Sequence, residues 1–546
     1  MRVTPNGQWA IASRDFFKAT GCEHCVRLSM AVKAKVPSVL AKVEPFEEDL
    51  STKLPIIQGN QRERIVFDQI RESLPSGDFV EFERATVEQT VAAMKNSTPV
   101  IAQGFFAREL QGYEWSGYAD LLVLEGFEIS QREDGKIVAA QVGPIPSTPK
   151  YMPWDVKASS AGDPKYQVQL AAYWEALEEL GFASDEPMGI VLGFNRGVVR
   201  YEPAASLELY REALSQLTAI LDLTTPDTIT AEFIQGWSCA KASVCGNVYC
   251  DYPKLCEKSF HEQDVLELLH NVDYRHSPKL RAAGFNTVSA LAQCEQCPDV
   301  PGLDPKFVER YWRGAQVMRV QQNGKKALLS KISGRLDLPE PTDRDLFFDV
   351  EWFNPVDSTG EFIFMFGAVT ADESFRCFIA ETPEQELEAF DHFLDRGMSQ
   401  LEANPEMHIY HYHNPEPKKV DMLVQRYGGH RAEDAAKLIA RMFDLRPIAM
   451  DAFVPGSGSY SIKSLEKYYD ADTKLHRGEL VAGGADAMYQ FELFRVALAE
   501  GRHGDAGKIM GVIADYNKDD CLSTKLLYDW LRSLHFESVN QIVEVN

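Results

Sequence analysis

The stretch Leu346-Phe347-Phe348-Asp349-Val350-Glu351 joins an apolar run to two carboxylates that stand two residues apart. Its apolar and aromatic residues predict a buried β-strand over 345–351, and a similar pattern predicts a second strand over 361–369. Side chains two residues apart on a strand point to the same face, so we expect Asp349 and Glu351 to project together. Such a pair of carboxylates can hold two metal ions that stabilise the attacking and the leaving oxygen of a displacement reaction.

A further acidic position lies near the C-terminus, in Tyr516-Asn517-Lys518-Asp519-Asp520. Tyr516 and Asp520 are four residues apart, so on a helix they share one face. Asp520 is therefore a third candidate metal ligand, and Tyr516 is a candidate for positioning an attacking water. We interpret Asp519 and Asp444 as simple solvated acids.

A second acidic cluster lies in the N-terminal half of the chain. Asp120 closes Gly117-Tyr118-Ala119-Asp120 in a predicted strand over 116–126, and Asp155-Val156-Lys157 lies in a predicted strand over 151–158. Between these strands we expect a loop rich in Gly, Pro and Ser. Asp155 and Lys157 share one strand face. Magnesium prefers carboxylate oxygens, so Asp120 and Asp155 are candidate ligands, and Lys157 can orient or activate water. Asp-x-Lys alone carries little weight, because most charged residues are simply solvated.

Two predicted helices add residues to this cluster. Gln169 and Tyr173 lie four residues apart on a predicted helix over 164–181, on one face, where they can steady the lysine or contact phosphate. Glu63 lies on a predicted helix over 61–75 and can complete the set of metal ligands. An exposed, uninvolved helix residue is the alternative interpretation of Glu63.

Length and element pattern predict several domains. The chain has 546 residues, the length of two or three domains, and 45% hydrophobic residues, as in ordinary globular proteins. Strands and helices alternate in both halves, which predicts an α/β multidomain fold. Short helical stretches and turn signals fill residues 260–320. We therefore predict an α/β domain over 1–258, a small helical linker over 259–335 and a second α/β domain over 336–546.

The net charge of −25 counts against tight, nonspecific binding of a polyanion. A global sum does not exclude a local basic groove, and carboxylates gather where metals bind. The chain has no run of eighteen apolar residues and no signal-peptide pattern, so we expect a cytoplasmic protein without a membrane partner.

The ten cysteines are too sparse for a disulfide scaffold, and their grouping favours metal or cluster ligation in a reducing compartment. Cys245, Cys250 and Cys256 lie close together, whereas Cys22 and Cys25 lie far upstream. Thiolates grouped in this way can hold a cubane [4Fe-4S] cluster. Four thiolates also suit structural zinc, and buried cysteines that pack as small apolar residues are a third interpretation.

The order Gly-x-x-Asp, Asp-x-Lys and Gln-x-x-x-Tyr resembles the RecB-type branch of the PD-(D/E)xK nucleases. This resemblance implies a restriction-endonuclease-like core around the N-terminal acidic cluster. Some RecB-type nucleases carry one cysteine before the core and three after it, which implies Cys22, Cys245, Cys250 and Cys256 as cluster ligands. Four residues separate Cys245 from the next cysteine where the family usually has two, so Cys239 and Cys25 are alternative ligands.

The C-terminal motifs resemble the DEDD exonucleases of the RNase H-like fold, in the variant with a tyrosine before the last aspartate. Residues 409–417 resemble the strand and turn that precede the second acid of that family, which implies Glu416 at this position, with Asp421 in reserve. The block 459–466 also matches the family and implies a positional role.

Over nearly its whole length the chain resembles the bacterial RecB-like nuclease family, in which both modules are joined by a small helix–hairpin–helix-like segment. The resemblance implies a Mg²⁺- or Mn²⁺-dependent nuclease that acts on DNA, with single-stranded or frayed ends as substrate, in repair, recombination or defence. The chain has no Gly-x-x-x-x-Gly-Lys-Ser/Thr loop, so a helicase partner would have to unwind the duplex. The alternatives are a nucleic-acid-binding scaffold with one or both sites inactive, and an RNA-processing exonuclease.

Overall fold

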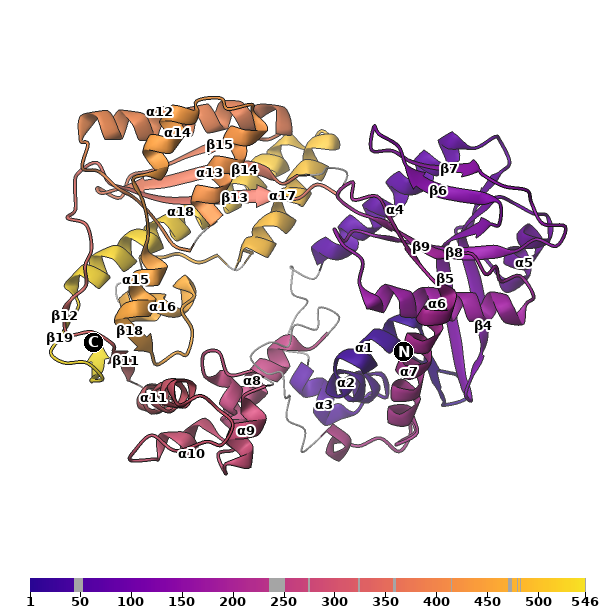
Figure 1. Ribbon diagram of the computed structural model, residues 1–546, viewed down its shortest axis with the longest axis horizontal. Coiled ribbons are helices and arrows are strands. Elements are labelled where there is room, and N and C mark those ends of the chain that lie inside the picture. The colour runs from indigo at the N-terminus through magenta and orange to yellow at the C-terminus, as the bar shows by residue number, and fades with distance from the viewer. Residues whose placement is uncertain are drawn as a thin grey trace. The chain divides into compact units, whose positions relative to one another are not determined.

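The computed structural model describes residues 1–43, 53–234, 251–273, 275–322, 325–356, 360–413, 415–469, 474–478, 480–481 and 483–545. These residues form two compact units, coloured from indigo to magenta and from magenta to yellow in Figure 1. The division falls within a helix near residue 257, and the described part of 354–360 belongs to the first unit. The predicted boundary at 335/336 lies inside the second unit, which also holds the helical region.

The elements of the first unit are β1 (Arg2–Val3), β2 (Trp9–Ile11), α1 (Ser13–Gly21), α2 (Glu23–Lys33), α3 (Pro37–Val43), α4 (Lys53–Ser73), β3 (Phe79–Glu81), α5 (Val87–Lys95), β4 (Val100–Leu110), β5 (Tyr113–Leu124), β6 (Phe127–Gln131), β7 (Ile137–Gln141), β8 (Tyr151–Lys157), α6 (Pro164–Glu179), β9 (Met188–Leu192), β10 (Val198–Tyr201), α7 (Pro203–Leu221) and η2 (Ala231–Ile234). Strand β5 is central to the main sheet and pairs with β2, β4 and β8. The β4–β5 hairpin turns at Gln111 and Gly112, which both have positive φ, as a two-residue type I′ turn requires.

Strand pairing brings the predicted motifs of the first unit together. Antiparallel pairing of β5 with β8 runs from Leu124↔Tyr151 to Leu121↔Trp154. Asp120 of β5 and Asp155 of β8 come immediately beyond the pair Leu121↔Trp154. Helix α6 packs against this sheet. It begins at Pro164 because the Asp163 side chain accepts a hydrogen bond from the Lys165 amide at 2.9 Å and caps the helix.

The elements of the second unit, with α8 reaching back into the first, are α8 (Pro253–Gln263), η4 (Leu266–Leu268), α9 (Ser277–Ala282), α10 (Val288–Ala292), α11 (Pro305–Gln322), β11 (Lys326–Ser330), β12 (Gly334–Arg335), β13 (Leu346–Phe353), β14 (Phe362–Thr370), β15 (Phe375–Ile379), η5 (Pro383–Gln385), α12 (Glu386–Ala403), β16 (Ile409–His411), α13 (Pro415–Arg426), α14 (Ala432–Ile439), β17 (Met442–Asp444), α15 (Leu445–Ala452), β18 (Phe453–Pro455), α16 (Ile462–Tyr469), α17 (Gly484–Ala499), α18 (His503–Ser533), β19 (His535–Phe536) and β20 (Ile542–Val545). Its main sheet has the order β15-β14-β13-β16-β17, with β14 antiparallel to β13 and β16 parallel to it.

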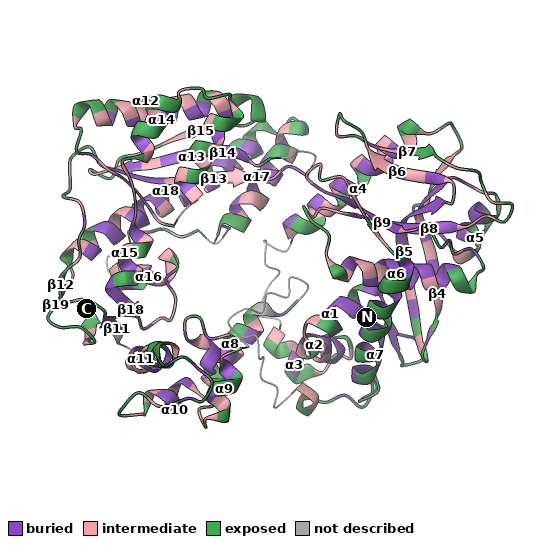
Figure 2. Cartoon of the chain, in the orientation of Figure 1, coloured by how far each residue is buried: buried purple, intermediate pink, exposed green. Residues whose placement is uncertain are grey.

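Alternation along β13 decides which residues face which helix. Phe348 stacks on Phe393 of α12, with ring centroids 4.5 Å apart, whereas Phe347 packs on Tyr528 of α18 at 5.7 Å. Odd-numbered residues of the regular part of the strand therefore face α18, and Asp349 is one of them. Strands β13 and β14 are mostly buried (Figure 2), as their apolar sequences predict.

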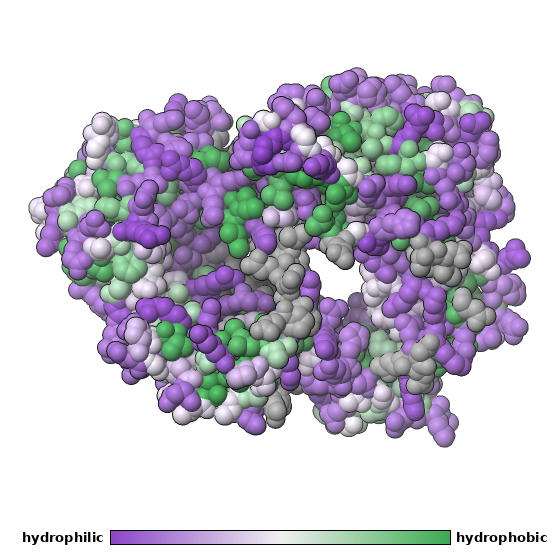
Figure 3. Space-filling view, turned by 180° about the vertical axis from the view of Figure 1, so that it is seen from behind, coloured by the Kyte–Doolittle hydropathy of each residue, from purple (hydrophilic) through white to green (hydrophobic). Residues whose placement is uncertain are grey.

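The short helices α9 and α10 and the longer α11 surround a small apolar core of their own, centred on Leu280, Val288, Leu291, Tyr311 and Ala315. On the face of the molecule shown in Figure 3, hydrophilic residues predominate. None of the described helices has the length and apolarity that crossing a membrane requires.

The predicted strands and helices around the acidic motifs are present, with one difference. The region between the strands predicted at 116–126 and 151–158 was expected to be a loop rich in Gly, Pro and Ser. It contains the hairpin β6–β7, whose Ile129, Ile137 and Ala139 are buried. Short alternating apolar residues around Asp134-Gly135 form this hairpin, and the Gly and Pro residues end it on the side of β8.

Candidate active sites

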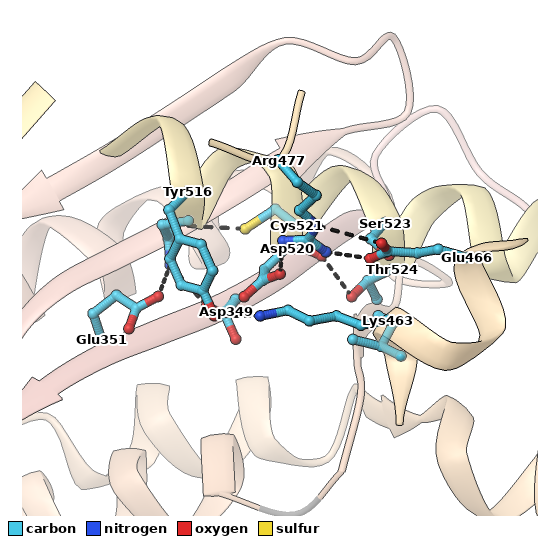
Figure 4. Close-up of polar contacts among 12 residues, drawn as sticks. Asp349, Glu351, Lys463, Glu466, Arg477, Tyr516, Asp520, Cys521, Ser523 and Thr524 are labelled. Carbon is cyan, nitrogen blue, oxygen red and sulfur yellow. Dashed lines mark hydrogen bonds and ion pairs between the residues drawn. The ribbon is translucent and has the colours of Figure 1, made fainter. Parts of the chain in front are cut away.

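Three carboxylates predicted from the C-terminal motifs converge. Asp349 and Glu351 on β13 and Asp520 on α18 offer oxygen atoms that all lie within 4.8 Å of one another. Figure 4 shows these side chains with their polar partners. Among the described residues, they are the one group of three acidic, histidine or cysteine side chains with this geometry. Glu351 is buried, and the other two are half-buried.

The electrostatics of this cluster suit a cation. Burial raises the pKa of Asp349 well above its ordinary value, and the negative charges of Glu351 and Asp520 raise it further. Burial and the charge of Asp520 raise the pKa of Glu351 to about 8. Carboxylates whose oxygens lie this close together cannot all be ionised at neutral pH without a compensating positive charge. A divalent metal ion with oxygen ligands supplies that charge, so this set of residues fits Mg²⁺ or Mn²⁺.

Asn517 orients two of the three carboxylates and was not predicted as a site residue. Its Nδ2 atom donates to Asp349 Oδ2 at 2.8 Å and to Glu351 Oε1 at 3.4 Å. Asn517 is fully buried, and a Cβ atom on Gly367 of β14 would lie 1.6 Å from its Oδ1. Gly367 therefore leaves the space that Asn517 needs. Asn517 lies three residues before Asp520 on α18, so the two share one helix face, and this spacing could have indicated Asn517 from the sequence.

Arg477 links Asp520 to Glu466 of α16, and sequence reasoning missed it. Its guanidinium contacts both carboxylates (Figure 4), and Ser523 Oγ donates to Glu466 Oε1 at 2.8 Å. These contacts hold Asp520 in place. Arg477 belongs to no helix or strand, so no periodic pattern could have indicated it.

Tyr516 lies one helical turn before Asp520. Burial raises the pKa of its hydroxyl, and the charges of Asp520 and Glu351 raise it further, so the phenol keeps its proton. Lys463 of α16 lies with its Nζ atom 3.3 Å from Tyr516 Oη. Lys463 and Glu466 both belong to the block 459–466, for which the family resemblance implied a positional role.

Glu416 lies in the first turn of α13 and does not belong to the group of three. Its carboxylate lies 3.2 Å from His411 Nδ1, and both side chains are 3% exposed. The charge of Glu416 is one of the causes that raise the pKa of Asp349, so the two groups interact electrostatically. Its role as the second acid of the site stays a prediction.

Two acids that we interpreted as solvated are not. Asp519 is 6% exposed, and burial raises its pKa. Asp444 caps α15: its Oδ1 atom accepts from the amides of Arg446 at 2.9 Å and of His413 at 2.8 Å. Helix packing and capping therefore account for these positions.

The N-terminal motifs also converge. Lys157 Nζ lies 2.5 Å from Asp155 Oδ2, and the Val156 amide donates to Asp120 Oδ2 at 2.8 Å. Burial, followed by the charge of Asp155, raises the pKa of Asp120 well above its ordinary value. Burial lowers the pKa of Lys157, but the charges of Asp155 and Asp120 outweigh it, and the net pKa is raised. Lys157 therefore remains a cation inside the cluster.

Helix α6 supplies the two remaining motif residues. Lys157 Nζ donates to Gln169 Oε1 at 3.2 Å, and Tyr173 Oη donates to the Tyr118 carbonyl at 2.6 Å. A Cβ atom on Gly117 would lie 2.7 Å from Tyr173 Oη. The glycine of Gly-x-x-Asp therefore makes room for the tyrosine that ties α6 to β5.

Glu63 on α4 lies close enough to the cluster that the charge of Asp155, after burial, raises its pKa. Gln103 Nε2 donates to Glu63 Oε1 at 2.7 Å. Gln103 lies within β4 with φ of +59°, an uncommon backbone conformation for a residue other than glycine. Nothing in the sequence indicated this residue.

The cysteines are described in part. Cys22 is half-buried, and Cys25 and Cys256 are buried. Lys18 of α1 and Asp251 form an ion pair of 2.5 Å, so the segments that lead to Cys22 and Cys256 lie close together. Cys239, Cys245 and Cys250 lie outside the described residues, and the choice between an iron–sulfur cluster and zinc stays a prediction.

Comparison with known proteins supports the C-terminal half of the resemblance. Searches of curated proteins and of solved structures found no match. A scan of family models matches residues 346–532 to the RNase_H superfamily. The matched range begins at the first residue of β13, ends within α18 and contains all three converging carboxylates. The chain is therefore a mixed α/β multidomain protein with an RNase H-like domain in its C-terminal region.

Proposed function

We propose that this protein is a metal-dependent nuclease whose RNase H-like site hydrolyses phosphodiester bonds at the ends of single-stranded DNA. The observation that carries this proposal is the group of Asp349, Glu351 and Asp520, whose oxygens lie within 4.8 Å of one another. Bound Mg²⁺ or Mn²⁺ would supply Lewis-acid stabilisation of the attacking and leaving oxygens. The three carboxylates would hold these ions.

The surrounding side chains prepare the site. Asn517 aligns Asp349 and Glu351, and Arg477 fixes Asp520 against Glu466. Tyr516 retains its proton and can hydrogen-bond the attacking water, while Lys463 holds the phenol in position. Such positioned groups accelerate a reaction because they need no reorganisation at the moment of reaction.

We propose a second hydrolytic site at Asp120 and Asp155. The ion pair between Lys157 and Asp155 favours it, because a lysine beside a candidate metal carboxylate can orient the attacking water or neutralise charge on phosphate. Glu63 and Gln169 border the same cluster. Both sites act on the same chemical bond, so their contributions must be separated by mutation.

Cleavage of a labelled single-stranded DNA 20-mer in Mn²⁺ or in EDTA tests the proposal. We expect cleavage only with metal, and a loss of about a thousandfold in Asp349→Asn, which corresponds to about 4 kcal/mol of transition-state stabilisation. Asp515→Asn, which changes an exposed acid of the same helix α18, should cut like the wild type.

Absence of cleavage by the wild type with either metal contradicts a nuclease and favours the scaffold. Residual cutting in Asp349→Asn that disappears in Asp349→Asn/Asp155→Asn assigns that cutting to the second site. Faster cleavage of the matching RNA 20-mer would replace DNA by RNA as the substrate.

A further inference from the structure

A pocket of about 190 Å³ lies within the second unit, and none of the three clustered carboxylates lines it. The helical region forms one wall with His270, Arg310 and Tyr311. The RNase H-like domain and β11 form the other with Lys331, Asp451 and Tyr460. None of these residues belongs to the site described above.

The lining of this pocket contains two cationic side chains and one acidic side chain. Arg310 and Lys331 line it, and Arg446 lies near enough to act on His270. None of the three forms an ion pair within 4 Å of any carboxylate in the described part of the chain, although acids outnumber Lys and Arg by 81 to 56. Asp451 is the one carboxylate in the lining. Lys331 Nζ donates a hydrogen bond to the Met450 carbonyl, but among the described residues no carboxylate within 4 Å neutralises any of the three charges. In so acidic a chain, these charges indicate a site for an anion.

All three positive charges act on His270. Burial lowers the pKa of His270, and Arg310, Arg446 and Lys331 lower it further. Burial also lowers the pKa of Lys331, and the attraction of Asp451 does not offset it. His270 and Tyr460 pack edge to face, with ring centroids 5.2 Å apart, which fixes this wall of the pocket.

The size of the pocket limits the anion. Pockets that enclose a drug-sized molecule usually measure about 300–1,000 Å³, so about 190 Å³ is too small for a whole nucleotide. It suits one small anionic group whose remainder stays outside. An arginine and a lysine that line one pocket are donors of the kind that binds phosphate.

The chain connects this pocket to the carboxylate cluster. Tyr460 in the lining is three residues from Lys463, which spans at most about 11 Å of chain. Lys463 contacts Tyr516, and Tyr412 donates a hydrogen bond to the carbonyl of Tyr460. The loop that closes the pocket therefore continues directly into the helix that supports the cluster.

We propose that this pocket binds one phosphate group of a nucleic-acid strand and so anchors the strand beside the RNase H-like site. The inference rests on the proposed function only in taking nucleic acid as the substrate. An internal phosphodiester and a terminal phosphate share this chemistry, and both sources are compared in the test. Inorganic phosphate alone would bind more weakly, because it lacks the contacts of the strand outside the pocket.

Binding of a fluorescent single-stranded DNA 12-mer to the full chain in EDTA tests the proposal without cleavage. We expect Arg310→Ala/Lys331→Ala to raise Kd at least tenfold. The slope of log K against log salt should become shallower by about 1.4, which is two lost phosphate contacts at about 0.7 each. Oligonucleotides with and without a 5′- or 3′-phosphate separate a terminal from an internal phosphate, since only a terminal anchor loses affinity when the end group is removed.

Arg319→Ala is the matched control, because Arg319 is exposed on the same helix α11 and nine residues, or about half a turn beyond two full turns, from Arg310. It should change Kd less than twofold. Equal Kd and salt slope in the double variant and the wild type overturn the proposal. Binding of inorganic phosphate with no effect of the double variant on the 12-mer overturns the strand anchor as well. A wild type that binds the 12-mer but never cleaves it would contradict the nuclease and leave the anchor standing.

Discussion

The two acidic clusters differ in how their charge is balanced. In the N-terminal cluster Lys157 lies among the carboxylates, 2.5 Å from Asp155, and its pKa is raised by them. In the C-terminal cluster Arg477 is shared between Asp520 and Glu466. Within the described part of the chain no ion pair joins Asp349 or Glu351 to a basic side chain, although the charge of Lys463 lowers the pKa of Glu351. We therefore expect the C-terminal cluster to need an external cation, whereas Lys157 supplies part of the counter-charge of the N-terminal cluster.

A cluster of carboxylates can therefore be balanced in two ways, by a lysine within the cluster or by a bound metal ion. A lysine inside a cluster keeps the carboxylates together before any metal binds. Without it, repulsion between carboxylates stores a free-energy cost that metal binding releases. Three changes test this difference between the clusters: removal of the internal cation, removal of the metal, and displacement of the residue that holds the C-terminal carboxylates.

Lys157→Met should have the largest effect. Removing one partner of a buried ion pair leaves Asp155 uncompensated, which costs about 3–5 kcal/mol of unfolding free energy. Urea unfolding of the full chain, followed by fluorescence, measures this loss. Mn²⁺ should recover part of it, because the altered cluster now resembles the C-terminal one. Lys136→Met, at an exposed lysine of the same unit, should stay within about 0.5 kcal/mol of the wild type.

Metal and pH should affect the C-terminal cluster next. The pKa of Glu351 is raised from 4.5 to about 8, so protonation favours the folded state, and this stability is lost as pH rises through that range. In EDTA we expect the melting temperature to fall between pH 5 and pH 8. Mg²⁺ at a hundred times its Kd should add about 2.7 kcal/mol at pH 8 and reduce the fall. Identical pH profiles with and without metal, or the same metal response in Asp349→Asn/Glu351→Gln, would contradict a metal site here.

Gly367→Ala should have the smallest of the three effects. Its Cβ would overlap Asn517 Oδ1 at 1.6 Å, and overpacking a buried position costs about 1–3 kcal/mol. Displacement of Asn517 should also slow cleavage, because the Nδ2 contacts to Asp349 and Glu351 are lost. Gly511→Ala in α18 meets no atom within 4 Å and should stabilise the protein by up to about 1 kcal/mol. Thermal unfolding and cleavage rates of the pair test whether Asn517 must occupy this space.

Local spacing predicted the parts of both sites that lie on regular elements. A period of two placed Asp349 with Glu351 and Asp155 with Lys157, and a period of four placed Tyr516 with Asp520. The strand and helix types followed from the same apolar patterns. The family model supports the RNase H-like part of the resemblance, whereas the RecB-type part stays a prediction.

The residues that sequence reasoning missed depend on tertiary structure. Arg477 reaches Asp520 from a segment without periodicity, and Gln103 contacts Glu63 through an unusual φ angle in mid-strand. Asp519, expected in solvent, is buried because α18 packs on more than one side. Whether a helical residue faces solvent or a neighbouring helix is decided by packing, which the spacing of one segment does not contain.

Helix α18 extends over 31 residues, a rod of about 46 Å. Near one part of its length it carries Tyr516, Asn517 and Asp520. Further along, Tyr528 Oη and Arg532 both donate to the carbonyl of Pro339, in the segment between β12 and β13. One continuous helix therefore joins the segment at Pro339 to the carboxylate cluster, and a substitution that shifts this segment should also shift Asp520.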